Sequence, residues 1–179
     1  MARKLLHYFL GLELWQKLGE IFLGQGEYTV EILQRFNMMD CKSMVTPMEA
    51  NLNKLATLDS DLVDLTMYKQ LIGSLMYLVS SRLDIYFAVS TFSQFMSEPR
   101  HEHWVAEKHV LRYLKGIVGY GLRYVSGDEV RLHGYIDYDW VGSAIDKNNT
   151  LGCCFNLGLA MIYWFSRKHT YVALSTTKA

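Results

Sequence analysis

Two acidic residues, Asp137 and Asp139, stand two positions apart in the otherwise apolar segment 134–142, GYIDYDWVG. Side chains alternate across a β-strand, so a strand here places both carboxylates on one face. Two carboxylates among tyrosine, isoleucine and tryptophan are costly unless a cation or hydrogen bonds compensate them. Hard cations such as Mg²⁺ prefer carboxylate oxygens. The spacing alone fits two interpretations, a metal-binding strand and a strand end with two solvated acids beside a turn.

Three basic residues, Lys108, Arg112 and Lys115, recur at helical spacing, and Arg123 follows them. Lysine and arginine side chains in such a row contact phosphate groups without reading a base sequence. The alternative is an ordinary solvated helix face. Eighteen basic residues balance eighteen acidic ones, so any basic surface is local.

The histidines and cysteines are weaker candidates for a metal site. His101, His103 and His109 do not show the i, i+4 spacing that places two metal ligands on one helical face. Cys153 and Cys154 are adjacent on a predicted strand, so their side chains point to opposite faces and favour a packing role. We interpret both groups as structural.

The other cysteine and the tryptophans point to a packed, reduced protein. Cys41 brings the cysteine count to three, which is a poor disulfide framework and fits an intracellular setting. The four tryptophans favour core packing, with base stacking as the alternative; they are Trp15, Trp104, Trp140 and Trp164.

The elements that must position these residues form a helical part followed by a β part. Apolar runs around a glycine-containing loop predict a β-hairpin over 7–16 and 20–24. Helical spacing predicts helices over 27–37, 66–80, 85–96 and 101–115. Asp84 is the predicted N-cap of the third helix, and Pro99 and Gly116 bound the fourth. Three short apolar segments predict an antiparallel meander over 132–140, 151–157 and 160–166, and the linker candidate is 40–64.

The composition is that of a folded protein. Of 179 residues, 50% are hydrophobic and 13% aromatic, which argues against disorder. No apolar run approaches the roughly 18 residues that a membrane-spanning helix needs. The apolar stretch 5–15 is followed by no small-residue cleavage site. We therefore expect a soluble, intracellular protein, cytoplasmic or nuclear, with no membrane partner and no secretion.

The chain resembles one family along nearly its whole length. Segments 134–152 (GYIDYDWVGSAIDKNNTLG) and 161–179 (MIYWFSRKHTYVALSTTKA) are similar to the start of the RNase H domain of copia-type LTR retrotransposon Pol polyproteins. Four earlier segments resemble the region that joins the reverse transcriptase to RNase H in the same polyproteins: 28–38, 41–48, 68–90 and 103–124.

This resemblance implies a fold and a function. The implied fold is α/β in the α+β sense, with a β-hairpin and a small helical bundle over residues 1–126, similar to a thumb or connection. An incomplete, truncated RNase H-like antiparallel sheet over 127–179 follows. The family activities are RNA-directed DNA synthesis and RNA–DNA hybrid cleavage. The implied partners are an RNA–DNA hybrid or other nucleic acid and the remainder of the polyprotein.

The resemblance also assigns site residues. Asp137 corresponds to the first catalytic acid, a ligand of the two Mg²⁺ ions that activate water and stabilise the leaving oxygen. Asp139 matches a second acid of the motif, to which we assign no metal. The next family acid, a glutamate, aligns with Lys178, and later acids would lie beyond Ala179. We expect Asp137 to be vestigial, with no stably bound Mg²⁺.

Other departures from the family pattern point the same way. Leu83 replaces a proline, and Asn148 and Asn149 stand where a basic residue and a serine are usual. The resulting hypotheses are an inactive remnant of a polyprotein, a nucleic-acid-binding piece without cleavage, and a residual metal-dependent nuclease. The third would use Asp137 with Asp139 or Asp146.

Overall fold

A computed structural model describes residues 8–49, 60–126, 131–139, 150–158 and 160–168. The chain divides into two compact units. One contains Ile21–Leu122 and the chain up to Lys17, and the other contains the chain from Arg123 onward together with Leu18–Glu20. The assignment of residues 1–126 and 127–179 to two domains of a polyprotein stays a prediction.

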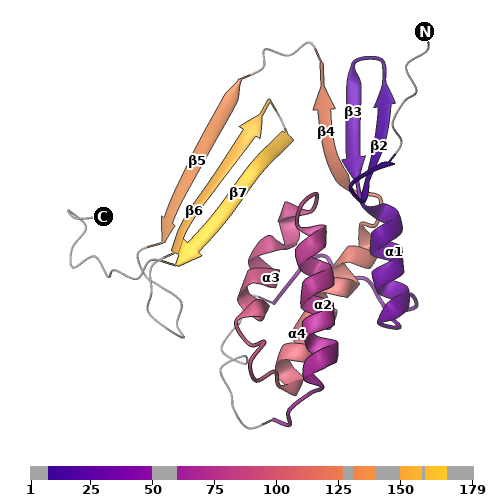
Figure 1. The fold of residues 1–179 in the computed structure, drawn as a ribbon, viewed down its shortest axis with the longest axis vertical. Helices are drawn as coiled ribbons and strands as arrows, with labels where there is room; N and C mark the ends of the chain where they lie inside the picture. Colours follow the sequence, from indigo (N-terminus) through magenta and orange to yellow (C-terminus); the bar gives the residue numbers. More distant parts are fainter. Residues whose placement is uncertain (1–7, 50–59, 127–130, 140–149, 159, 169–179) are drawn as a thin grey trace, which may run out of the picture. The chain divides into compact units, whose positions relative to one another are not determined.

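The predicted hairpin near the beginning of the chain is confirmed, and it belongs to a four-stranded sheet (Figure 1). The strand order is β1-β2-β3-β4, with β1 (Tyr8–Phe9), β2 (Leu12–Lys17), β3 (Glu20–Gly24) and β4 (Gly121–Val125). The fourth strand comes from about a hundred residues further along the chain. Its pairing with β3 was not predicted, because a contact at that separation leaves no local pattern.

The single strand predicted over 7–16 is wrong in one respect. Leu10 and Gly11 have φ angles of 50° and 76°, so the chain turns back there and β1 pairs antiparallel with β2, with Tyr8 opposite Glu13. Positive φ at both residues of a two-residue turn matches the twist of a hairpin. Only glycine adopts such angles at little cost, and Gly11 supplies one of the two.

The first unit contains four α-helices, α1 (Gly26–Arg35), α2 (Leu65–Leu78), α3 (Tyr86–Ser93) and α4 (His101–Gly116). A short 3₁₀ helix, η2 (Leu83–Ile85), comes directly before α3. All four predicted helices are present. Their apolar faces meet in one core, whose fully buried side chains include Ile32, Leu71, Leu75, Phe92, Leu111 and Leu114. Asp64 begins α2, where its carboxylate accepts hydrogen bonds from the backbone N–H groups of Thr66 and Met67.

The predicted N-cap role of Asp84 is wrong. Asp84 lies inside η2, and α3 begins without a side-chain cap. Its carboxylate instead accepts from Arg82 Nε and Nη2 at 3.0 and 2.7 Å and from the Tyr113 hydroxyl at 2.8 Å. Arg82 is almost fully buried, so it requires a charged partner, and that requirement outweighs a backbone cap. The hydrogen bond from Tyr113 therefore connects α4 to η2.

The predicted antiparallel meander is confirmed as a three-stranded sheet (Figure 1). Its order is β5-β6-β7, with β5 (Leu132–Asp139), β6 (Thr150–Leu157) and β7 (Ala160–Lys168). The ladder is regular between β5 and β6 and shifts at Phe155/Asn156 between β6 and β7. Within the described residues the fold is thus a mixed α+β arrangement of four α-helices and two antiparallel sheets. No helix in the described ranges is long and apolar enough to cross a membrane.

Candidate functional site: a basic helix row and an acidic strand

The predicted basic row lies on α4, where the side chains of Lys108, Arg112 and Lys115 are all half-buried. They are not a freely solvated face. The Nζ atom of Lys108 lies 5.0 Å from the ring centroid of Trp104, a cation–π contact one helical turn away. Trp104 in turn packs edge-on against Phe36. The first cation of the row is therefore held above a fixed aromatic ring.

The other two cations hold a segment that we call the strap, residues 41–46. Arg112 Nε donates to the Lys42 carbonyl at 2.8 Å, and Lys115 Nζ donates to the Cys41 carbonyl at 2.5 Å. The strap N–H of Met44 donates to the Arg112 carbonyl at 3.2 Å. The strap thus runs antiparallel to α4.

Each side-chain contact uses only some of the donors that a cation offers. A lysine ammonium has three N–H donors and an arginine guanidinium has five. No described acidic residue forms an ion pair with Lys108, Arg112 or Lys115. Within the described residues the row therefore keeps its positive charge. Arg123 is not part of it, because it lies on β4 and pairs with Glu20 at 2.6 Å.

The three histidines of α4 have structural roles or exposed positions. His103 is 2% exposed, its Nδ1 accepts from the Arg100 N–H at 3.0 Å, and its ring stacks on Phe95 at 3.8 Å. His109 Nε2 lies 3.0 Å from the Thr46 carbonyl and anchors the strap. Among the described residues, no three His, Cys, Asp or Glu side chains converge as metal ligands.

The two aspartates of the acidic strand lie at the end of β5. Asp137 is opposite Gly152 and Asp139 is opposite Thr150 on β6. The predicted strand is therefore confirmed at both positions. Their side chains, and the whole of Asp146 and Lys178, lie outside the described part of the structure. The metal-ligand role of Asp137 stays a prediction.

The two neighbouring cysteines lie in the middle of β6. Cys153 is 7% exposed, whereas Cys154 is half-buried. They are adjacent in β6, opposite Ile136 and Tyr135 of β5, and side chains alternate along a strand, so the two cysteines face opposite sides of the sheet. Both are free thiols. This arrangement agrees with a packing role.

One charged residue in the core of the first unit was not predicted. Glu107 on α4 is 0% exposed, and neither carboxylate oxygen has a hydrogen-bond partner among the described residues. Burial raises the pKa of Glu107 to about 9, and the neighbouring Tyr68 hydroxyl offsets only part of that rise. The carboxyl is therefore neutral at pH 7. Its position one turn from Leu111, on the apolar stripe of α4, was the signal that could have revealed it.

Comparison with known proteins identifies relatives of this chain. The retrovirus-related Pol polyproteins from transposons RE2 and RE1 of Arabidopsis thaliana are each 39% identical to 97% of this chain. An uncharacterized mitochondrial protein of the same plant is 33% identical over 96% of the chain, and the match covers 71% of that protein. No family model matches the chain, and no solved structure matches it significantly.

The two relatives with the highest identity among these are retrovirus-related Pol polyproteins from transposons. The chain belongs to the Pol polyprotein family of copia-type retrotransposons, which confirms the resemblance of its motifs. It spans only 12% of the length of the two transposon polyproteins.

Proposed function

We propose that this chain is the part of a copia-type Pol polyprotein that connects the reverse transcriptase to RNase H, and that it does not cleave RNA–DNA hybrids. The order of its motifs supports the first statement. The second depends on the two family metal-ligand positions that lie within this sequence, where Asp137 keeps the acid and Lys178 replaces a glutamate. Bound Mg²⁺ would supply water activation and charge stabilisation in such a site. Asp137 would contribute a carboxylate to it.

The residue at the next family ligand position carries the opposite charge. Lys178 stands where the family has a glutamate. At about 5 Å and an effective dielectric near 20, an ammonium and a dication repel each other by on the order of 6 kcal/mol. The lysine can turn toward solvent, so this figure is an upper bound. Even then this position lacks the carboxylate that the family uses to bind a metal ion.

The basic row favours a second function, the binding of nucleic-acid backbone without cleavage. The observation that supports it is the fixed geometry of Lys108, Arg112 and Lys115, which no described acid neutralises. Cations held in place lose less side-chain entropy when a phosphate binds. The contacts would be to phosphates and would not depend on base sequence.

Two assays test these proposals separately. Incubation of the folded chain with a labelled RNA–DNA hybrid and Mg²⁺ or Mn²⁺ is expected to give no product. Fluorescence anisotropy with the same hybrid is expected to show binding at low salt that weakens steeply as salt increases. Cleavage that Asp137→Asn abolishes would favour the residual nuclease instead. An absence of binding at low salt would rule out the binding function.

A further inference from the structure

We propose that the strap is itself part of the phosphate-binding surface, with Lys42 and Ser43 contacting the same nucleic-acid backbone as Arg112 and Lys115. The inference rests on the proposed binding function and adds residues to it. Neither strap residue lies on the helix whose spacing indicated the basic row. They join it only through the fold, because about seventy residues separate Lys42 from Arg112 along the chain.

The position of Lys42 follows from its backbone contact. Its carbonyl accepts from Arg112 Nε at 2.8 Å, and the preceding carbonyl, of Cys41, accepts from Lys115 Nζ. Lys42 is therefore attached between two cations of the row, and its side chain is exposed. No described acid forms an ion pair with it. The strap thus adds a fourth positive charge to the row of three.

A glycine allows the strap to lie close to the end of α4. A Cβ atom added at Gly116 would lie 3.3 Å from Ser43 Cβ and 3.7 Å from the Met44 carbonyl oxygen. Ser43 is exposed there, beside the last turn of the helix. Its hydroxyl is a suitable neutral donor to a phosphate oxygen. The backbone of Lys42 and the side chain of Ser43 therefore lie beside the last turns of α4, next to the basic row.

The length of the row suits a nucleic-acid strand. Lys108 and Lys115 are seven residues apart, which is about 10 Å along an α-helix at 1.5 Å per residue. One strand of a DNA duplex rises about 3.4 Å per nucleotide, so this distance corresponds to roughly three phosphates. Four cations over three phosphates are enough to neutralise them. A polyanion with regularly spaced charges is thus a better match than a single small anion.

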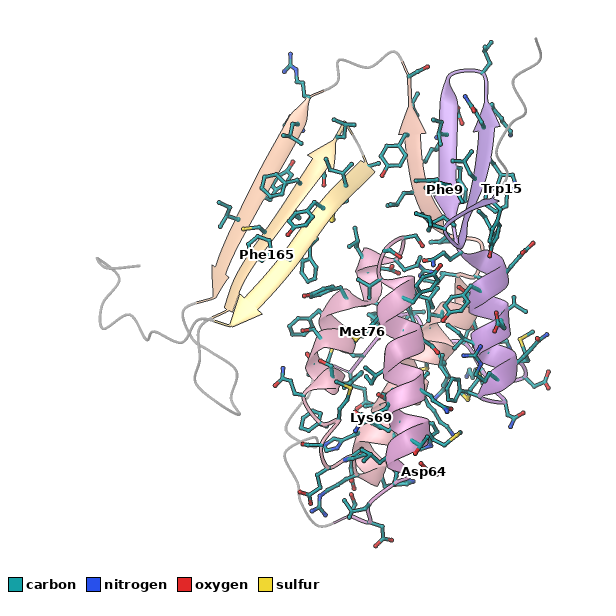
Figure 2. The ribbon with its side chains drawn as sticks, in the orientation of Figure 1. Phe9, Trp15, Asp64, Lys69, Met76 and Phe165 are labelled. Carbon is teal, nitrogen blue, oxygen red and sulfur yellow. The ribbon has the colours of Figure 1, made fainter. Side chains whose placement is uncertain are left out.

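The test compares Lys42→Gln with Lys69→Gln, a matched control that removes an exposed lysine from α2 (Figure 2). Anisotropy titrations of a labelled RNA–DNA hybrid are run on the full chain at several salt concentrations. For Lys42→Gln we expect a Kd increased by roughly three- to tenfold at low salt and a log–log salt slope reduced by about 0.9, the value of one phosphate contact. Lys69→Gln is expected to match the wild type.

The outcomes separate the two proposals. If the wild type does not bind at low salt, the proposed binding function is wrong. If the wild type binds and the two variants behave alike, the binding function stands and the role of the strap is overturned. A lower affinity with an unchanged salt slope would also contradict the inference, because a lost phosphate contact must change the slope.

A cross-link tests whether the strap stays on α4 when nucleic acid binds. The double variant Ser43→Cys/Gly116→Cys, with Cys41→Ser to remove the neighbouring thiol, brings two Cβ atoms close to disulfide distance. Binding by the oxidised and reduced forms is compared, after mass spectrometry confirms the bond. We expect the two Kd values to agree within about threefold. Loss of binding on oxidation would show that the strap must leave, and would overturn the inference.

Discussion

The carboxyl group of Glu107 is buried beside the hydroxyl of Tyr68, and that hydroxyl donates to the Phe92 carbonyl at 2.9 Å. The carboxyl is left without a hydrogen-bond partner among the described residues. Burying a neutral carboxyl group in this way costs far less free energy than burying an unpaired carboxylate. The helical core of this protein therefore contains a group whose ionisation opposes folding.

This burial predicts an unusual pH dependence of stability. The pKa of Glu107 is about 9 in the folded chain, against an ordinary value of 4.5. Between these values the folded state binds more protons at Glu107 than the unfolded state, so the contribution of this group to stability is largest below about pH 4.5 and falls as the pH rises toward 9. The slope from this one group is about 1.4 kcal/mol per pH unit. Urea unfolding followed by circular dichroism at pH 5, 7 and 9 measures it.

The matched variants separate Glu107 from other acids. Glu107→Gln keeps the shape of the neutral acid, so its stability is expected to vary much less with pH and to exceed that of the wild type at pH 8. Glu31→Gln, which changes an exposed acid on α1, is expected to keep the wild-type slope. Equal slopes for the wild type and Glu107→Gln would contradict this account of the core.

A second prediction concerns the contact between Asp84 and Tyr113. Burial favours a raised pKa for Asp84, but the hydrogen bonds and charge of Arg82, with the Tyr113 hydroxyl, bring that pKa below its ordinary value. Stability from this carboxylate is therefore present above the ordinary pKa and is lost as the pH falls through the lowered one. Tyr113→Phe removes one donor and is expected to cost about 1 kcal/mol at pH 7, since Asp84 is partly exposed.

The measurement for Tyr113→Phe is urea unfolding at pH 7 and pH 3. The difference from the wild type is expected to shrink at pH 3, because this lies below the ordinary pKa of an aspartate and the unfolded chain is then protonated at Asp84. Tyr120→Phe is a suitable control, because Tyr120 is exposed on the chain after α4. A loss of stability of the same size at both pH values would place the effect of Tyr113 in packing, with no contribution from its hydroxyl.

A third prediction concerns Lys108 above Trp104. Lys108→Gln removes the charge at one end of the row and is expected to reduce the salt slope of hybrid binding by about 0.9. Trp104→Leu keeps the charge but removes the ring that holds it. We expect it to weaken binding while leaving the slope nearly unchanged. Identical slopes for Lys108→Gln and the wild type would exclude Lys108 from the interface.

Much of the fold could be predicted from the sequence, because the helices and strands depend on the local spacing of apolar residues. The apolar spacing of α2 and α4 and the short apolar strands β5, β6 and β7 each have a recognisable pattern, and their predictions are confirmed. The role of Asp84 was predicted wrongly, because the sequence does not distinguish an aspartate that caps a helix from one that pairs with a buried arginine. The choice between them depends on Arg82 being buried, which is a property of the folded chain.

The candidate site was less predictable because its parts meet across long separations. The basic row follows from the spacing of Lys108, Arg112 and Lys115, but its contacts with the strap do not. Those contacts join residues 63 to 74 positions apart. The neutral Glu107 was missed because a helical glutamate is ordinarily exposed, although its place on the apolar stripe of α4 was a signal of burial. The metal-ligand role of Asp137 depends on the family motif and not on the described geometry.

The central claim is that this chain does not cleave RNA–DNA hybrids. The most direct test incubates the full chain, shown to be folded by circular dichroism, with a labelled hybrid in Mg²⁺ and then Mn²⁺, beside Asp137→Asn. The account predicts no product from either protein, while the hybrid still binds at low salt. Cleavage by the wild type that is lost in Asp137→Asn would contradict it, because Asp137 would then assemble a working metal site despite Lys178.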